Sequence, residues 1–178
     1  QNRFKEHKSI PFIEEYKINF KSPTKVEVVV FEKSVVGCVS YMSSYMYFDR
    51  EGIVVESSGR KLEGVPWITG MDLGRVVLYQ PLPVADSRIF EEILNLTQQL
   101  SLYEILVDQI RFDTYNQPIL TIGQMEVILG NMGNIDSKLS VLNDILTDQP
   151  QLREIRGTLK LGDYSETNDR AGITFKKK

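Results

Sequence analysis

Residues 35–48 read VVGCVSYMSSYMYF, and this β-rich stretch decides the fold. Successive side chains of a strand point to opposite faces, so a strand over these residues divides them into two rows. One row begins with Val35 and Gly37, the other with Val36 and Cys38, and both rows are largely apolar or aromatic. We therefore expect a single strand that is covered on both faces along much of its length.

The next segment predicts a hairpin. Residues 49–52 read Asp-Arg-Glu-Gly, a polar turn, and the apolar residues 53–55 return the chain. Gly52 supplies the positive φ that a tight turn between strands requires.

The composition is that of a globular protein. At 178 residues the chain fits one domain, or one domain plus a fragment. A net charge of −3 gives no support to nucleic-acid binding. Cys38 is the single cysteine, which excludes an intramolecular disulfide and a cysteine metal cluster. We expect Cys38 to be a small buried hydrophobe within its strand.

No apolar run is long enough to span a bilayer, and the chain has no signal-peptide pattern. The chain opens on Gln1 rather than Met, which we interpret as a fragment of a longer protein. A membrane anchor upstream of this fragment fits that interpretation.

The first 33 residues predict a small unit of their own. Apolar residues alternate with polar ones over residues 14–20, and residues 25–33 form a partner strand after a turn at residues 21–24. Two strands alone bury little surface, so we expect this unit to be part of a larger domain.

Two amphipathic helices are expected in the rest of the chain. Residues 87–102 follow Asp86, a good N-cap, and carry an apolar stripe that should cover a sheet. A second helix begins at Asn134 or Asp136 and ends before Pro150.

Further strands are expected at residues 75–80, 105–114, 119–122, 125–129, 153–161 and 172–176. Trp67 should anchor an apolar loop at residues 65–70. The pattern predicts an α+β fold, a largely antiparallel β-sheet with two amphipathic helices packed on it.

The residues that carry chemistry do not form an enzyme site. His7 is the only histidine and lies in the polar N-terminal segment, so neither a catalytic triad nor a common zinc site can be assembled. Neither pair of nearby carboxylates suits acid–base catalysis. Glu91 and Glu92 are adjacent on a helix and point in different directions, and the side chains of Asp108 and Asp113 point to opposite faces of a strand. The glycine-containing loop at residues 130–134 lacks the Lys-Ser/Thr of a phosphate-binding loop. We expect no catalytic residues, no metal and no cofactor.

Several segments resemble the FtsQ/DivIB family of bacterial cell-division proteins. Residues 32–37 (EKSVVG) resemble the segment that joins the POTRA domain of that family to its β domain, and residues 47–54 (YFDREGIV) resemble the next family motif. Residues 65–70 (VPWITG), 127–130 (VILG) and 138–142 (KLSVL) are similar to further motifs in the same order, and Pro11-Phe12-Ile13 and Pro23 match POTRA positions. Residues 160–162 (KLG) depart from the Asp-Leu-Arg common near the C-terminus of the family.

The resemblance implies a domain organisation and a function. Residues 1–33 would be the C-terminal part of a POTRA-like domain and residues 34–178 the β domain. Members of the family are single-pass membrane proteins that act outside the membrane as divisome scaffolds. They bind FtsL-type and FtsB/DivIC-type coiled-coil partners and help to control septal cell-wall synthesis. A cell-wall-binding or regulatory module unrelated to division is the alternative that the residues leave open.

The last strand is the expected partner-binding site. A short strand at the end of the chain should lie at a sheet edge, where unpaired backbone groups can receive a strand from another protein. In the resembled family the last strands of the β domain receive the FtsB/DivIC-type partner. The amide of Thr174 is one candidate donor, and one row of side chains should pack inward while the other faces solvent. The residues expected to form the site are Tyr164, Arg170, Ala171, Gly172, Ile173, Thr174, Phe175 and Lys176.

Overall fold

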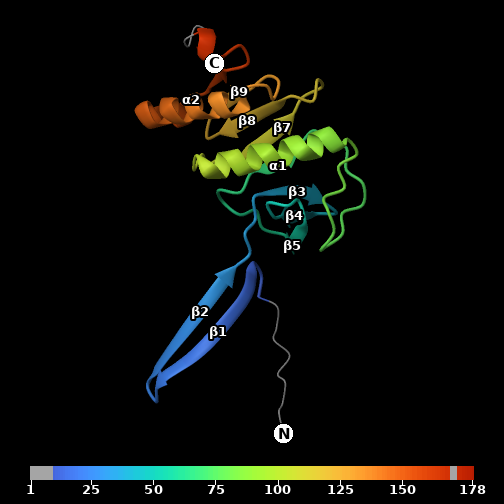
Figure 1. Ribbon diagram of the computed structural model, residues 1–178, viewed down its shortest axis with the longest axis vertical. Coiled ribbons are helices and arrows are strands. Elements are labelled where there is room, and N and C mark those ends of the chain that lie inside the picture. The colour runs from blue at the N-terminus through green and yellow to red at the C-terminus, as the bar shows by residue number, and fades with distance from the viewer. Residues whose placement is uncertain (1–9, 169–171) are drawn as a thin grey trace. The chain divides into compact units, whose positions relative to one another are not determined.

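The computed structural model describes residues 10–168 and 172–178. The chain divides into two compact units, Gln1–Ser34 and Val35–Lys178 (Figure 1). The two helices and nine of the eleven strands belong to the larger unit, which confirms the α+β class. Neither described helix is long and apolar enough to cross a membrane.

The smaller unit is a two-stranded antiparallel hairpin, as the sequence predicts. Strand β1 (Ile13–Ser22) pairs with β2 (Lys25–Glu32). Apolar residues face one another across the strands, with Ile18 opposite Val28 and Phe20 opposite Val26. This apolar face is open within the described residues, since 51% of Ile18 and 81% of Phe20 is exposed. A hairpin with an uncovered apolar face is marginally stable by itself.

The larger unit is built on one nine-stranded mixed sheet. Its strand order is β11-β10-β9-β8-β7-β6-β3-β4-β5. The pairs β3–β6, β6–β7 and β9–β10 are parallel, and the other five are antiparallel. The strands are β3 (Gly37–Tyr41), β4 (Ser44–Phe48), β5 (Val54–Ser58), β6 (Trp67–Thr69), β7 (Gln109–Phe112), β8 (Pro118–Ile122), β9 (Met125–Ile128), β10 (Gly157–Lys160) and β11 (Thr174–Lys177).

The sheet is mixed and not largely antiparallel as we expected, and helical crossovers account for two of its three parallel pairs. Helix α1 (Ser87–Leu102) connects the parallel strands β6 and β7. Helix α2 (Ile135–Asp148) and the short 3-10 helix η1 (Pro150–Glu154) connect the parallel strands β9 and β10. Neighbouring parallel strands need a long connection of this kind, whereas antiparallel neighbours can be joined by tight turns. A second 3-10 helix, η2 (Glu166–Asn168), lies between β10 and β11.

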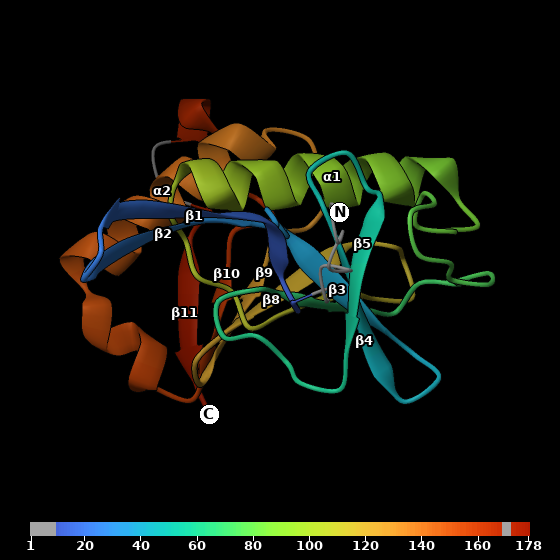
Figure 2. The same ribbon diagram turned by 90° about the horizontal axis from the view of Figure 1, so that it is seen from below.

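Both helices are as the sequence predicts. The side chain of Asp86 accepts a hydrogen bond from the N–H of Arg88 and caps α1. Helix α2 begins just after Asn134 and ends before Pro150. The helices lie on the same face of the sheet (Figure 2). Their apolar stripes join one core with a row of buried residues that crosses the central strands, namely Ile68, Ile110, Leu120, Val127 and Leu159.

The segment at residues 35–48 is a hairpin and not the single strand that we expected. Strands β3 and β4 are joined by a two-residue turn in which Met42 has φ 47° and Ser43 has φ 64°. Consecutive positive φ values are typical of a type I′ turn, which usually carries Asn or Gly. The expectation of cover on both faces is confirmed, since Val39 and Cys38 are both fully buried on opposite faces. The hydroxyl of Tyr47 binds the loop over the second face, donating to Arg60 O (2.7 Å) and accepting from Leu62 N–H (2.7 Å).

The turn at residues 49–52 is confirmed. The carboxylate of Asp49 accepts hydrogen bonds from the N–H groups of Glu51 (2.9 Å) and Ile53 (3.0 Å). Gly52 has φ 80°, and a Cβ atom there would lie 2.5 Å from the ring of Phe90 in α1. The turn therefore needs glycine both for its backbone conformation and for the approach of the helix.

Two expectations in the middle of the chain are wrong. Trp67 lies in β6, between two parallel neighbours, and does not anchor a loop. Residues 75–80 form no strand. The chain turns at residues 78–80, just before Pro81, where the N–H of Gln80 donates to Val77 O (3.3 Å). Gln80 O accepts a hydrogen bond from Val54 N–H (3.0 Å), and Leu82 N–H donates to Gly52 O (2.8 Å).

Candidate partner-binding edge strand

Strand β11 is one edge of the nine-stranded sheet and β5 is the other. The two edges differ in what covers them. Backbone groups of Gln80 and Leu82 bind Val54 and Gly52, which covers the start of β5. In residues 10–168 and 172–178, no strand pairs with the outer side of β11. Strand β11 is therefore an open edge of the sheet, whereas β5 is covered at its start.

Two backbone hydrogen bonds fix which groups of β11 face outward. Lys178 N–H donates to Arg156 O (2.9 Å), so the residue pair Arg156–Lys178 is hydrogen-bonded. On the other side of β10, Leu161 N–H donates to Ile128 O of β9 (2.9 Å), which gives the same alternation along β10. Hydrogen-bonded and non-bonded pairs alternate in an antiparallel ladder.

The alternation assigns each amide of β11 to a side. Thr174 and Lys176 stand opposite Lys160 and Thr158, and their N–H and C=O groups face β10. The corresponding groups of Phe175 and Lys177 face outward. The amide of Thr174 is thus turned toward the sheet and is not the donor that we expected for a partner.

The aromatic ring of Phe175 continues the core row to the edge. Phe175 stands opposite Leu159, the last fully enclosed member of that row. The ring lies over Gly157, where a Cβ atom would be 2.6 Å from it. Phe175 is 37% exposed, because no further strand lies beside it. A strand added here would find both outward backbone groups and an apolar neighbour.

The opposite face of the edge is polar and basic. Thr174 and Lys176 are exposed on it. The ammonium of Lys178 lies 3.6 Å from the carboxylate of Glu126, which also holds Arg111 at 3.7 Å. Lysines on an edge strand discourage pairing between identical edges, and they favour an acidic partner.

The other expected site residues differ in their surroundings. Tyr164 is half-buried and packs against the core, so its side chain does not project as a free anchor. Ile173 is also half-buried against the core, as expected for an inward row. Gly172 precedes the strand, where a Cβ atom would lie 2.5 Å from Asp163 O. Arg170 and Ala171 lie outside the described residues.

Asp108 and Asp113, two of the carboxylates considered for catalysis, each bind backbone N–H groups. Asp108 accepts a hydrogen bond from Gly123 N–H (2.8 Å), and Asp113 accepts from Tyr115 N–H (2.8 Å) and Gln117 N–H (3.0 Å). No group of three or more His, Cys, Asp or Glu side chains is placed to hold a metal ion within the described part of the chain. His7 falls outside that part. Burial raises the pKa of the Cys38 thiol to about 11, so it is protonated at neutral pH.

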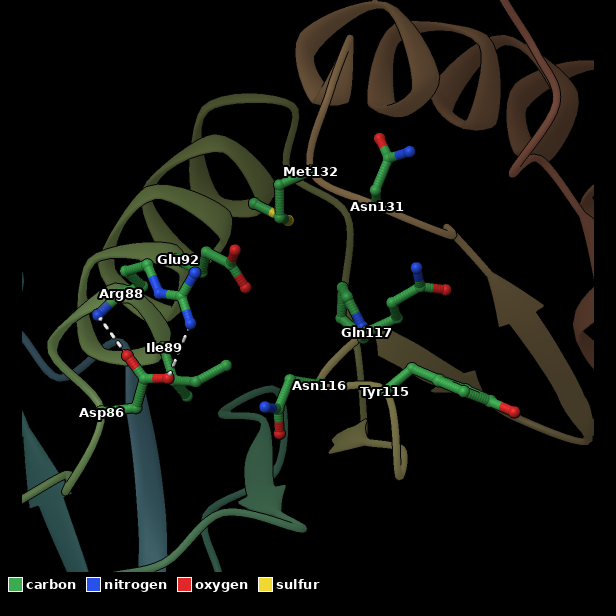
Figure 3. A pocket seen from close by; sticks show the side chains of 10 residues that line it. Asp86, Arg88, Ile89, Glu92, Tyr115, Asn116, Gln117, Asn131 and Met132 are labelled. Atoms are coloured by element: carbon green, nitrogen blue, oxygen red, sulfur yellow. Dashed lines mark hydrogen bonds and ion pairs between the residues drawn. The ribbon is translucent and has the colours of Figure 1, made fainter.

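Sequence reasoning missed one feature of the larger unit. A cavity of about 210 Å³ opens between the first turn of α1, the β7–β8 turn and the loop before α2 (Figure 3). Its lining comes from residues 86–92, 115–118 and 131–132, and no sequence motif connects these three segments.

No protein-family model matches this chain, and no curated protein matches it.

Proposed function

We propose that this chain is the extracytoplasmic part of an FtsQ/DivIB-type cell-division protein and acts as a non-enzymatic scaffold. In this proposal a single upstream transmembrane helix holds it at the cell membrane. Strand β11 receives a strand from an FtsB/DivIC-type partner, an FtsL-type protein joins the complex, and the assembly helps to control septal cell-wall synthesis.

The open edge at β11 is the observation that carries this proposal. Phe175 and Lys177 present outward N–H and C=O groups, and the apolar core row ends at a half-covered aromatic ring. A partner strand would satisfy the backbone groups and place a side chain beside Phe175. Main-chain hydrogen bonds supply affinity in this mode, and the alternate side chains supply specificity.

The family motifs have physical roles in this fold, which supports the resemblance at the level of architecture. Asp49 and Gly52 build a turn beneath α1. At Gly37 a Cβ atom would lie 2.6 Å from the ring of Phe48, so the position requires a very small residue. Lys138 binds two carbonyl groups in the loop that follows β9.

The hairpin β1–β2 supports the proposed POTRA remnant. Its apolar face, formed by Tyr16, Ile18, Phe20, Val26, Val28 and Val30, is mostly exposed within the described residues. A hairpin of this kind normally packs against further elements of its own domain. We assign that cover to the remainder of a POTRA-like domain.

The proposal is tested with the purified extracytoplasmic domain of the FtsB/DivIC-type protein from the same organism. Two variants at one position separate the backbone from the side chain. Lys177→Ala removes the ammonium and keeps the N–H, whereas Lys177→Pro removes both. Loss of one outward hydrogen bond costs about 1–2 kcal/mol, so Lys177→Pro should bind roughly 5–30-fold more weakly than Lys177→Ala.

Circular dichroism and thermal unfolding show whether both variants remain folded. Equal affinities of folded Lys177→Ala and Lys177→Pro would contradict strand addition at β11. Failure of the wild-type chain to bind the division partner, together with binding to isolated cell wall, would favour a wall-binding module instead.

A further inference from the structure

The cavity beside α1 contains a carboxylate that lacks a partner. Glu92 lies in the second turn of α1 and lines the cavity. Its Oε2 atom is buried and makes no hydrogen bond within the described residues. Figure 3 shows the carboxylate directed into the space between α1 and the β7–β8 turn. A buried acceptor without a donor is unfavourable, so a bound donor would be stabilised here.

The charges around the cavity leave an excess of negative charge. Asp86 and Arg88 form an ion pair at 3.4 Å, and Asp86 also caps the helix. Glu92 has no cation of its own at bonding distance among the described residues. The titratable and charged side chains that line the cavity are Asp86, Arg88, Glu92 and Tyr115, which sum to one net negative charge when Glu92 is ionised.

The remaining polar lining consists of amide groups. Asn116 and Gln117, from the β7–β8 turn, line the cavity across from α1, and their side-chain amides extend away from Glu92 (Figure 3). Asn131, from the loop before α2, already accepts a hydrogen bond from Gly133 N–H (2.9 Å). Glu92 is therefore the charged group of this lining that has no ion-pair partner among the described residues.

The apolar lining suits an aliphatic stem. Ile89, Pro118 and Met132 line the cavity, and Tyr115, which is 82% exposed, stands at its edge. Drug-sized ligands usually occupy cavities of about 300–1,000 Å³, so a space of about 210 Å³ suits a single side chain.

We propose that this cavity binds an arginine side chain presented by a peptide or a partner protein. The guanidinium carries five donors in a fixed plane, and two of them can bind the Glu92 carboxylate. Its three methylene groups contact Ile89 and Met132. Rotation about the last torsion of Glu92, which is broad, turns Oε2 toward the ligand.

Burial also makes the ionisation of Glu92 sensitive to a bound cation. Desolvation is the largest cause that raises the pKa of the Glu92 carboxyl, while Arg88 opposes this effect. A guanidinium in the cavity stabilises the ionised form and lowers that pKa. The site thus predicts a coupling between arginine binding and the titration of Glu92.

The test uses the full chain and N-acetyl-arginine N-methylamide as the probe, followed by NMR. The expected result is saturable shifts at Glu92, Asn116 and Gln117, with a lower Glu92 carboxyl pKa in the bound state. The citrulline analogue, which keeps the shape and loses the charge, should bind at least tenfold more weakly.

Matched variants on α1 locate the site. Glu92→Gln should weaken the arginine probe at least tenfold, whereas Glu91→Gln at the exposed neighbour should leave its affinity unchanged. Arg88→Gln should strengthen binding, because it removes the nearest competing cation. Equal binding of arginine and citrulline probes, equal losses in Glu91→Gln and Glu92→Gln, or no saturable shift would each overturn the proposal. None of these measurements involves β11, so they stand apart from the division partner.

Discussion

The ammonium of Lys138 lies 2.8 Å from Leu129 O, the carbonyl group that follows β9. The same ammonium donates to Asn131 O at 2.9 Å, and only 2% of Lys138 is exposed. Burial lowers the pKa of this amine from its ordinary value of 10.5, with a smaller opposing effect of Asp163. Lys138 therefore fixes the loop between β9 and α2 at the cost of burying a charged group.

Lys138→Ala should destabilise the fold by about 2–4 kcal/mol, because two carbonyl groups lose their donor and a cavity remains. Urea unfolding measures this change. Lys160→Ala, at an exposed lysine of β10, should stay within about 0.5 kcal/mol of the wild type. Similar free energies of unfolding for the two variants would contradict the role given to Lys138.

Gly52→Ala should destabilise the larger unit by about 2 kcal/mol or more, because an L-residue is strained at φ 80° and the ring of Phe90 must move. Gly59→Ala is the matched control, since a Cβ atom there has no neighbour within 4 Å and its φ is not positive. We expect the control to leave the thermal unfolding midpoint unchanged or slightly higher. An equal decrease in both variants would show that the turn does not need glycine.

The Cys38 thiol should resist alkylation in the native protein and react after unfolding, because it is fully buried and its pKa is raised to about 11. In the unfolded chain the thiol has its ordinary pKa of 9.0. The folded state therefore holds the proton more tightly, and this stabilisation is present below pH 9 and lost between pH 9 and about 11.

The difference in unfolding free energy between wild type and Cys38→Ala should accordingly fall by about 2 kcal/mol over that interval, as a shift of two pKa units implies. Unfolding series at pH 8 and pH 11 provide the measurement. A constant difference, or rapid alkylation of the folded protein at pH 8, would contradict the buried position of Cys38.

Local patterns in the sequence predict the parts of the fold that depend on local physics. Helix α1 was predicted with its N-cap at Asp86 because the apolar stripe and the cap lie within one short segment. The turn at Asp49 and Gly52 was predicted for the same reason. The turn at Met42 and Ser43 was not, because neither residue type favours a positive φ.

Non-local relationships could not be read from the sequence. The parallel pairing of β6 with β7 depends on where α1 returns the chain, and no local pattern in either strand indicates it. An edge position for the last strand was expected, yet the side that Thr174 N–H faces depends on its register with β10. The cavity at Glu92 combines three segments that are distant in the chain.

The central claim is that β11 receives a partner strand through its outward backbone groups. Amide hydrogen exchange, resolved by NMR with and without the FtsB/DivIC-type partner, tests it most directly. In the free protein the amides of Thr174 and Lys176 should exchange more slowly than those of Phe175 and Lys177, because only the first pair bonds to β10. Saturating partner should slow exchange at Phe175 and Lys177 at least tenfold and leave Thr174 and Lys176 little changed. Unchanged exchange at Phe175 and Lys177 in the saturated complex would contradict the claim.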